Sequence, residues 1–487
     1  MPRRTPHPRR WLIALTAPLL ALAAACGSPE APPPLTIGHL ADFSGPFRDQ
    51  GTLVQSGVAL AVTHVNQAGG VLGQPVRLVT GDTAADPAQA VAEARRLLQE
   101  EGVHAIVGPP TSAATLALVD LAVAARLPLI SPSATAPALT TADDDGFLFR
   151  TIGSDAVQGI VLAQLADRVA GGAIAVLYRD DAWGRGLHAV FAAHYGGALT
   201  AVAYPPTAQP SYLAELRQAA RGGASVLLTM GFGESATLLG EAIAHDLFAR
   251  FLLTDGNRNA ALLAQVGAAP LEGALGTAAG SDPTNPATQA WNTDYVAAHG
   301  ALPAEPFVRE GYDAAIAIAL AAQAAGTTDG GAIRDQLRRV AGPPGPVYLA
   351  GAAGVTEALA AAARGAALNY EGAASPIDWD AAGDIPRGVM EIFTVRDGRF
   401  ETLEIVPFDL TAPAAPVPPA TDPPPDVGGL ACLQEQLAGS PAGERIGAVL
   451  TGADPTGAGL TLEESAALGQ AVEACGIETE FEFPEAS

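Results

Sequence analysis

The chain has 487 residues, of which 49% are hydrophobic, so it is long enough for two or three packed domains and too apolar to be disordered throughout. Its 26 basic and 51 acidic residues give a formal net charge of −25. Nucleic-acid phosphates would be repelled by such a surface, so the composition argues against a nucleic-acid partner.

The N-terminus has the pattern of a secretory signal peptide. Four arginines precede an apolar run at 11–25 that is too short for a transmembrane helix and ends in small residues before Cys26. The segment "LAAAC" looks like a bacterial lipobox, with Ala23 where leucine usually stands. We expect a signal peptide with lipobox at 1–26, lipid on Cys26 and a short stiff tether at 27–34. An ordinary signal peptide with a chance cysteine is the alternative.

Strand and helix patterns then alternate as far as residue 132. Each helix follows a short apolar strand, and the second begins with Asp86 as its cap and Pro87 at its first position. The expected strands are 35–40, 75–83, 103–108 and 128–132, and the expected helices are 53–70, 86–102 and 115–127. This order predicts β-α-β units, and hence a parallel sheet with helices on both faces.

The alternation restarts after "FLFRTIGSD" and continues to residue 280. The expected helices are 156–171, 183–197, 211–221 and 234–246, and the expected strands are 173–181, 199–205, 224–231, 250–256 and 273–280. The next stretch has a long helix at 310–326 and late strands at 389–395 and 401–406, too few strands for a third sheet. We therefore predict an α/β fold with two similar doubly wound lobes, one from 35–150 and 281–380 and the other from 151–280 and 381–407.

The C-terminal residues form a separate small unit in this prediction. A proline-rich linker at 408–427 leads to a helical appendix at 428–487, which is too small to be stable without a covalent staple. Cys432 and Cys475 are the only cysteines besides Cys26, and an exported protein can oxidise them. We expect them to form a disulfide.

Motifs for catalysis or metal binding are missing from the sequence. There is no HExxH and no P-loop, and "GFGES" at 231–235 has Thr237 where a nucleophile elbow needs glycine. The acidic run at 143–145 lacks the alternating ligands of an EF-hand, so we interpret it as a solvated loop. The histidines of the predicted helices form no i, i+4 pair: His64, His188, His194 and His245. We expect no enzymatic activity, no cofactor and no metal.

The stretch "LISPSATAP" at 129–137 changes abruptly from a buried strand to small hydroxyl side chains. Ser131, Ser133 and Thr135 follow one another between two prolines. They are common loop formers, which is one interpretation. The other is that they line a ligand crevice, because ligands bind at the carboxyl ends of strands in open α/β sheets.

Taken together, the motifs between 35 and 407 resemble the type I periplasmic solute-binding proteins of ABC transporters, particularly the leucine/isoleucine/valine-binding group. The order and spacing of the motifs carry this resemblance, since each is weak by itself. They are "IGHLADFSGPF", "QGTLVQSGVALAVTHVNQAGGVLGQPVRLVTGDTAADPAQAV", "IVGPPTSAAT", "LISPSATAPALT", "FLFRTIGSDAVQG", "YRDDAWGRG", "EGYDAAIAIA" and "IDWDAAGDI".

The resemblance implies that two strand-end loops of the first lobe hold the charged groups of an amino acid. By position, Ser112 would give its hydroxyl and N–H to the ligand carboxylate. Thr135 would give its N–H to the carboxylate and its hydroxyl to the ammonium, next to Ala134, and the Ser133 carbonyl would accept from the ammonium. Such neutral groups bind a zwitterion without burying an ion pair.

From the second lobe, the resemblance implies three more ligand contacts. Asp255 falls where an acid meets the ammonium, Trp183 where an aromatic side chain closes over the ligand, and Phe232 near another aromatic position. Trp183 as a core residue and Asp255 as a turn residue are the alternatives. The sequence departs from the family at Thr111, in place of a cysteine, and at Gln50, in place of an aromatic residue.

The implied function is an extracytoplasmic receptor in the cell envelope, anchored to the membrane by lipid. Its two lobes would close about a hinge on an amino acid or amide, with a branched-chain amino acid favoured, and deliver it to an ABC permease. A ligand-sensing domain that regulates a membrane partner is the alternative function.

Overall fold

The structure, a computed structural model, describes residues 32–303 and 305–411. Cys26, Cys432 and Cys475, and with them the expected lipidation, disulfide and helical appendix, lie outside these residues. Among the described helices, none combines the length and apolarity needed to cross a bilayer.

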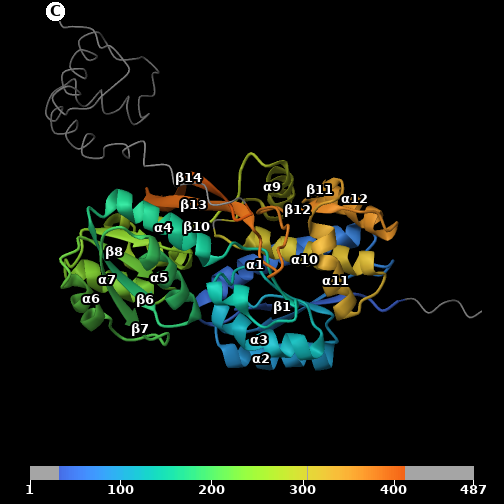
Figure 1. Cartoon of the computed structure of the whole chain (residues 1–487), viewed down its shortest axis with the longest axis horizontal. Coiled ribbons are helices and arrows are strands. Elements are labelled where there is room, and N and C mark those ends of the chain that lie inside the picture. Colours follow the sequence, from blue (N-terminus) through green and yellow to red (C-terminus); the bar gives the residue numbers. More distant parts are fainter. Residues whose placement is uncertain (1–31, 304, 412–487) are drawn as a thin grey trace, which may run out of the picture. The chain divides into compact units, whose positions relative to one another are not determined.

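The first sheet contains five parallel strands and is built from the first third of the chain (Figure 1). Its strand order is β2-β1-β3-β4-β5. The strands are β1 Thr36–Ala41, β2 Arg77–Asp82, β3 Ala105–Val107, β4 Leu129–Ser131 and β5 Leu148–Arg150. The helices that connect the first four strands are α1 Arg48–Gln67, α2 Pro87–Arg96 and α3 Ser112–Ala125.

The second sheet has seven strands in the order β14-β13-β10-β9-β8-β6-β7. The strands are β6 Ala173–Arg179, β7 Ala198–Tyr204, β8 Val226–Met230, β9 Arg250–Leu253, β10 Leu275–Ala279, β13 Arg387–Arg396 and β14 Arg399–Asp409. Five are parallel, whereas β13 and β14 form an antiparallel hairpin at one edge. The helices are α4 Asp155–Val169, α5 Ala182–His194, α6 Leu213–Ala220, α7 Ser235–Ala244 and α8 Ala260–Val266. These two sheets confirm the predicted α/β class.

Residues 281–380 contain more helices and strands than the sequence indicates. The helices are α9 Pro286–His299, α10 Val308–Ala325, α11 Gly330–Ala341 and α12 Ala352–Ala363. Two three-residue strands, β11 Val347–Leu349 and β12 Asn369–Glu371, also form a small parallel sheet of their own. Strands this short carry no readable alternation of apolar residues, which is why the sequence analysis missed them.

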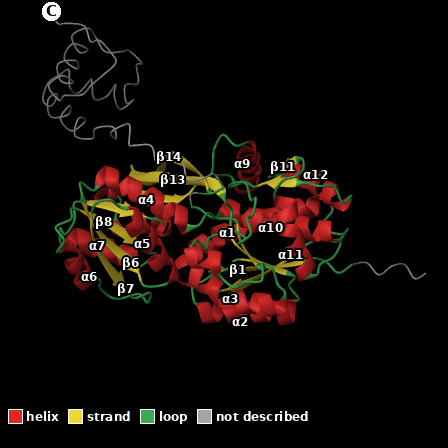
Figure 2. Ribbon diagram, viewed as in Figure 1, coloured by secondary structure: helices red, strands yellow, loops and turns green. Residues whose placement is uncertain are grey.

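Each sheet is covered by helices on both faces, as Figure 2 shows. In the first sheet, Ile37 and Val107 pack with α1 and α10, while the neighbouring positions Leu40 and Ile106 pack with α2 and α3. The second sheet divides in the same way, with α6, α7 and α8 on one face and α4 and α5 on the other. Burial on both faces explains why the strands are nearly continuous apolar runs rather than alternating ones.

A buried ion pair ties the end of the first sheet to the segment that leads into β13. Arg150, at the end of β5, is 1% exposed and donates to Asp384 from Nε at 2.6 Å and from Nη2 at 2.5 Å. The same guanidinium donates to the carbonyl of Ala136 at 3.2 Å, in the loop after β4. The Trp379 indole N–H also donates to the Arg150 carbonyl, at 2.6 Å. This arginine therefore fixes the position of the "LISPSATAP" loop.

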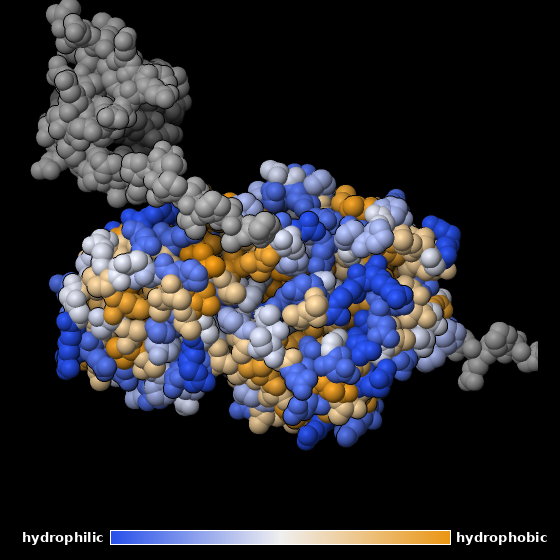
Figure 3. Space-filling view, viewed as in Figure 1, coloured by the Kyte–Doolittle hydropathy of each residue, from blue (hydrophilic) through white to orange (hydrophobic). Residues whose placement is uncertain are grey.

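The visible surface mixes hydrophilic and hydrophobic residues, and on the described part it shows no broad uninterrupted hydrophobic band (Figure 3). The large hydrophobic side chains that are well exposed are scattered over several elements: Val296, Leu302, Val347, Leu403 and Leu410.

Replacing Asp384 should destabilise the protein strongly. The change Asp384→Asn leaves the buried Arg150 guanidinium without its counter-charge, which typically costs about 3–5 kcal/mol. Chemical denaturation followed by circular dichroism measures this loss. The matched control is Glu404→Gln, which removes the partner of the largely exposed Arg168 at 3.2 Å and should cost below about 1 kcal/mol. Equal losses in the two variants would contradict the role given to Asp384.

Candidate functional site

Two loops meet at the carboxyl ends of β3 and β4, and side-chain hydroxyls hold them together. Ser131 Oγ donates to the Pro109 carbonyl at 2.7 Å, and Ser133 Oγ donates to the Pro110 carbonyl at 2.9 Å. The N–H of Ala136 donates to Ser112 Oγ at 3.1 Å. The hydroxyls of Ser131 and Ser133 thus have a structural role, because they hold the two loops against each other.

Helix α3 begins at this junction and offers hydrogen-bond donors. Thr111 is its cap and accepts from the Ala114 N–H at 3.4 Å. The first N–H groups of a helix have no intrahelical acceptor and attract anions. The hydroxyl proton of Ser112 is also available, since Ser112 Oγ uses only a lone pair for Ala136. This end of the site therefore suits a carboxylate.

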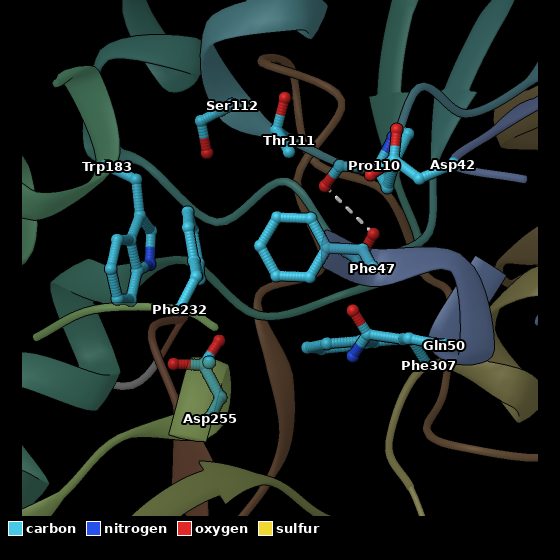
Figure 4. Close-up of a pocket in the computed structure, with 12 residues that line it drawn as sticks. Asp42, Phe47, Gln50, Pro110, Thr111, Ser112, Trp183, Phe232, Asp255 and Phe307 are labelled. Atoms are coloured by element: carbon cyan, nitrogen blue, oxygen red, sulfur yellow. Dashed lines mark hydrogen bonds between the residues drawn. The ribbon is translucent and has the colours of Figure 1, made fainter. Parts of the chain in front are cut away.

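A cavity of about 420 Å³, counting the solvent at its mouth, opens beside α3 (Figure 4). Residues from both sheets line it: Asp42, Phe47, Gln50, Pro110, Thr111, Ser112, Ser133, Trp183, Phe232, Asp255, Gly256 and Phe307. The sequence prediction named Ser112, Ser133, Trp183, Phe232 and Asp255 among these. Ala134 and Thr135 are buried and do not line the cavity as it stands.

Asp255 supplies a buried carboxylate to this cavity. It follows β9, is 5% exposed, and accepts from Gln158 Nε2 at 3.0 Å. Gln158 also donates to the Thr277 carbonyl at 3.1 Å, which fixes the amide against the end of β10. Burial raises the pKa of Asp255 to about 6. The carboxylate is therefore charged at neutral pH but titrates close to it.

A second acid, Asp155, lies near Asp255 and was missed by the sequence analysis. It is the first residue of α4, is fully buried, and neither carboxylate oxygen accepts a hydrogen bond from a described residue. Burial and repulsion by Asp255 hold the pKa of Asp155 well above its usual range. The Thr135 hydroxyl lies close enough to the Asp155 carboxylate to lower this pKa in part, although the geometry between them falls short of a hydrogen bond. Among the described residues, the two buried acids thus have no cationic partner, and the Thr135 hydroxyl has no hydrogen-bond partner.

An aromatic wall of stacked rings forms one side of the cavity. Trp183 stacks on Phe232 with ring centroids 4.4 Å apart, and Phe47 meets the same phenyl ring edge-on at 4.9 Å. Trp183 is at once a core residue, 3% exposed, and a lining residue of the cavity. Gly256 permits this packing, because a Cβ there would lie 2.6 Å from the Phe232 ring.

A polar network behind the wall holds Phe232 in place. The Arg179 guanidinium lies 5.2 Å from the Phe232 ring centroid and donates to Asp181 at 2.6 Å and to Glu234 at 2.9 Å. Glu234 also accepts from Tyr204 at 3.0 Å and from the Phe232 N–H at 3.3 Å. Phe232 is therefore held by a cation–π contact to its ring and by a hydrogen bond from its backbone N–H.

Sequence reasoning missed the buried Asp155 and, among the lining residues, Phe307 and Phe47, for different reasons. Asp155 follows the capping residue Ser154 in the first turn of α4, where an acid is common because it stabilises the helix N-terminus. Phe307 adopts a positive φ of 77° immediately before α10, an uncommon conformation for a bulky side chain that is often found at binding sites. Phe47 follows "SGP" and carried no recognisable pattern. Among the described residues, no group of three potential ligands could hold a metal ion.

Comparison with known proteins assigns the chain to a family. A family model described as periplasmic binding protein matches residues 34–399. The substrate-binding protein BasB of a chemotactic signal transduction system in Halobacterium salinarum is 31% identical over 383 residues, which is 77% of this chain and 90% of that protein. A leucine-, isoleucine-, valine-, threonine- and alanine-binding protein of Pseudomonas aeruginosa is also 31% identical, over 66% of this chain and 86% of that protein.

Solved structures share the fold. The branched-chain amino acid transporter substrate-binding protein LivJ from Streptococcus pneumoniae, in complex with isoleucine, matches with a TM-score of 0.64 and 24% identity, over 77% of this chain and all of that one. A solute-binding protein of R. palustris in complex with benzoate matches with a TM-score of 0.60 and 20% identity, over 77% of this chain and 97% of that one.

The family match covers the first sheet, all strands of the second sheet except β14, and the residues that line the cavity, and the relatives are solute-binding proteins rather than enzymes. The chain therefore belongs to the type I periplasmic binding proteins, in the leucine/isoleucine/valine-binding group.

Proposed function

We propose that this protein is the substrate-binding component of an ABC importer and binds a free L-α-amino acid in the cavity at Asp255. The observation that carries this proposal is the pair of buried acids, Asp155 and Asp255, which has no cationic partner among the described residues. Donors at the start of α3 lie on the same cavity and suit a carboxylate. A zwitterion fits this arrangement, because its ammonium can pair with the buried acids and its carboxylate can accept from the donors of α3.

The proposed roles follow from these contacts. The ligand carboxylate accepts from Ser112 and from the first N–H groups of α3. The ammonium donates to Asp255 and to the Ser133 carbonyl, and it approaches Asp155 and the Thr135 hydroxyl after a small movement of the 133–135 loop, which includes Ala134. Trp183 and Phe232 cover the ligand. Burial and repulsion by Asp255 raise the pKa of Asp155, which favours a pair with less than two full negative charges opposite the single ammonium.

Importer function requires that the ligand stabilise a closed form. We assign 35–150 and 281–380 to one lobe and 151–280 and 381–407 to the other, with the ligand bridging them about a hinge. Relatives support a branched-chain amino acid as ligand, since LivJ holds isoleucine. The delivery partner would be an ABC permease.

We also propose that the protein is held in the cell envelope by lipid on Cys26, after removal of residues 1–25 and with 27–34 as tether. The linker at 408–427 and the appendix at 428–487, stapled by a Cys432–Cys475 disulfide, complete the proposed organisation. All three cysteines lie outside the described residues.

Ligand sensing is a second candidate function. It is favoured by the similarity to BasB, which is named as part of a chemotactic signal transduction system. A sensor would regulate a membrane receptor rather than a permease, while binding its ligand in the same cavity. Co-purification of the anchored protein with a permease, or instead with a receptor, distinguishes the two functions.

Amino-acid affinity should fall as the pH drops below about 6. The ammonium needs a charged Asp255, and since its pKa is about 6 in the free protein, binding at lower pH must first remove a proton. Calorimetric titration from pH 5 to 7.5 with the amino acid selected by a thermal-shift screen measures this trend. Asp255→Asn should bind about 10- to 150-fold more weakly at pH 7.5 and lose the step near pH 6. The same step in both proteins would rule out Asp255 as the group responsible.

Thr135→Ala should weaken binding without harming the fold. Its hydroxyl is buried and makes no hydrogen bond in the free protein, so its loss costs the fold little, whereas losing a hydrogen bond to an ammonium costs about 10- to 150-fold in affinity. Thr288→Ala is the matched control, because that buried hydroxyl donates to the Ala373 carbonyl at 2.9 Å away from the cavity. Unaltered affinity in Thr135→Ala would remove this residue from the site.

Cys26→Ser should release the protein from the membrane fraction, because a serine at this position cannot form the thioether to lipid. Fractionation of cells followed by immunoblotting measures the distribution. Membrane association that persists in the variant would contradict the proposed anchor.

A further inference from the structure

The two buried acids are not equivalent, because only one of them lies on the ligand cavity. Asp255 lines the cavity, and Figure 4 shows its carboxylate directed toward Phe232 and Trp183. Asp155 is fully buried and is not among the lining residues. As the structure stands, a negative charge meets an ammonium in the cavity directly only if it resides on Asp255.

Gln158 connects the helix that carries Asp155 to Asp255. It lies on α4, three residues after Asp155, and is 2% exposed. Its Nε2 donates to Asp255 Oδ1 at 3.0 Å and to the Thr277 carbonyl at 3.1 Å, with the Thr277 hydroxyl oxygen at 3.4 Å. Gln158 does not itself line the cavity, so its route to a ligand runs through Asp255.

The Thr277 carbonyl fixes which end of the Gln158 amide faces Asp255. A carbonyl oxygen only accepts hydrogen bonds, so the amide turns its NH2 group toward it, and the same NH2 group faces Asp255. Burial raises the pKa of Asp255, and this donor, which favours the charged carboxylate, lowers it in part. Asp155 has no comparable donor, since neither of its oxygens accepts a hydrogen bond from a described residue.

The arginine that acts on the acid pair does not favour a charge on Asp255. Arg150 lowers the pKa of Asp155, although burial and repulsion by Asp255 raise that pKa more strongly. Its guanidinium is bound to Asp384. The charge of Arg150 alone would therefore favour ionisation of Asp155, the acid that does not line the cavity.

Two further charged side chains belong to the surroundings of Asp255. Arg258 lies three residues later and forms an ion pair with Glu391 of β13. Asp42, which follows β1, is the other acid that lines the cavity, and Figure 4 shows it across the cavity from Asp255. Burial raises the pKa of Asp42, and its carboxylate can only accept or repel when charged. The side-chain donor that Asp255 receives is Gln158.

We propose that Gln158 is a positioning residue of the ligand site: its amide holds the Asp255 carboxylate in place and keeps the negative charge of the acid pair on Asp255 rather than on Asp155. This inference rests on the proposed binding of an α-amino acid, whose ammonium Asp255 would meet. The alternative is a purely structural role, in which Gln158 only joins α4 to β10 through the Thr277 carbonyl. The two roles differ in the pH dependence of binding, because only the first involves the protonation of Asp255.

Removing the amide should move the pH dependence of binding upward. In Gln158→Met, which has a similar length and no donor, Asp255 loses the bond that favours its charged form, so its pKa rises. Calorimetric titration between pH 5.5 and 8.5 with L-leucine, L-isoleucine and L-valine measures the affinity. The step expected near pH 6 in the wild-type protein should rise by about one pH unit or more, as expected for a lost hydrogen bond to a charged group. The loss of affinity should narrow by pH 8.5.

Gln323→Met is the matched control. It removes a half-buried amide of α10 that accepts from the Leu72 N–H at 2.8 Å and does not line the cavity. This variant should keep the step near pH 6. Circular dichroism shows whether each variant folds. If Gln158→Met does not fold, Gln158→Asn, whose amide is one methylene shorter and falls short of Asp255, takes its place with the same expectation.

A double variant tests whether Gln158 acts through Asp255. In the Asp255→Asn protein, Gln158→Met should change the affinity by less than about twofold, because the effects of two residues that act as one unit do not add. A further loss as large as the one that Gln158→Met causes in the wild-type protein would overturn the proposed connection.

The outcomes separate this inference from the proposed function. A step that stays near pH 6 in Gln158→Met, with amino-acid binding retained, overturns the positioning role and leaves the proposed function intact. An equal loss of affinity at every pH also overturns it, in favour of the structural role. Failure of the wild-type protein to bind any of the three amino acids instead overturns the proposed function, and this inference with it.

Discussion

The arrangement of the site depends on negative charge buried without a positive partner. Asp155 and Asp255 repel each other in a setting that raises the pKa of both, and Arg150, whose charge acts on Asp155, is committed to Asp384. A cation that leaves water to balance such a pair loses its hydration. Binding is therefore favourable only if the remaining N–H groups of the cation also find hydrogen-bond acceptors. The Thr135 hydroxyl lies close to Asp155, and Ser133 lines the same cavity as Asp255. In the proposed function, the ammonium of the ligand supplies the positive charge that this pair lacks.

Hydrogen bonds hold the loops and the aromatic side chains that surround the cavity. Hydroxyl groups tie the loops after β3 and β4 to each other, and Arg150 connects the second of these loops to the segment before β13. Across the cavity, Arg179 and Glu234 hold Phe232, which in turn positions Trp183. Each wall is thus fixed by its own polar network, so that a ligand bridging the walls can bind preorganised groups on both.

The sequence predicted the architecture well because each sheet is built from repeated local units. Apolar strands followed by capped helices indicated both sheets. The end of one strand pointed to Ser133 as a lining residue, whereas the resemblance to the family pointed to Ser112 and Asp255. Asp155 and Phe307 escaped prediction because their roles arise from distant packing: an acid at a helix start has a local explanation, and Phe307 depends on a strained backbone. Gln50 was noticed as a departure from the family, and the structure places it in the lining of the cavity.

The most direct test of the central claim, that the cavity recognises a zwitterion, uses three versions of one ligand. The L-α-amino acid that binds best in a screen is compared by calorimetry with its analogue lacking the α-ammonium and its analogue lacking the α-carboxylate. The account predicts that the intact amino acid binds at least about tenfold more tightly than either analogue, since each analogue leaves one buried set of polar groups unpaired. A carboxylic acid without the ammonium that bound as tightly as the amino acid would contradict the account, because the buried acids would then have no part in recognition.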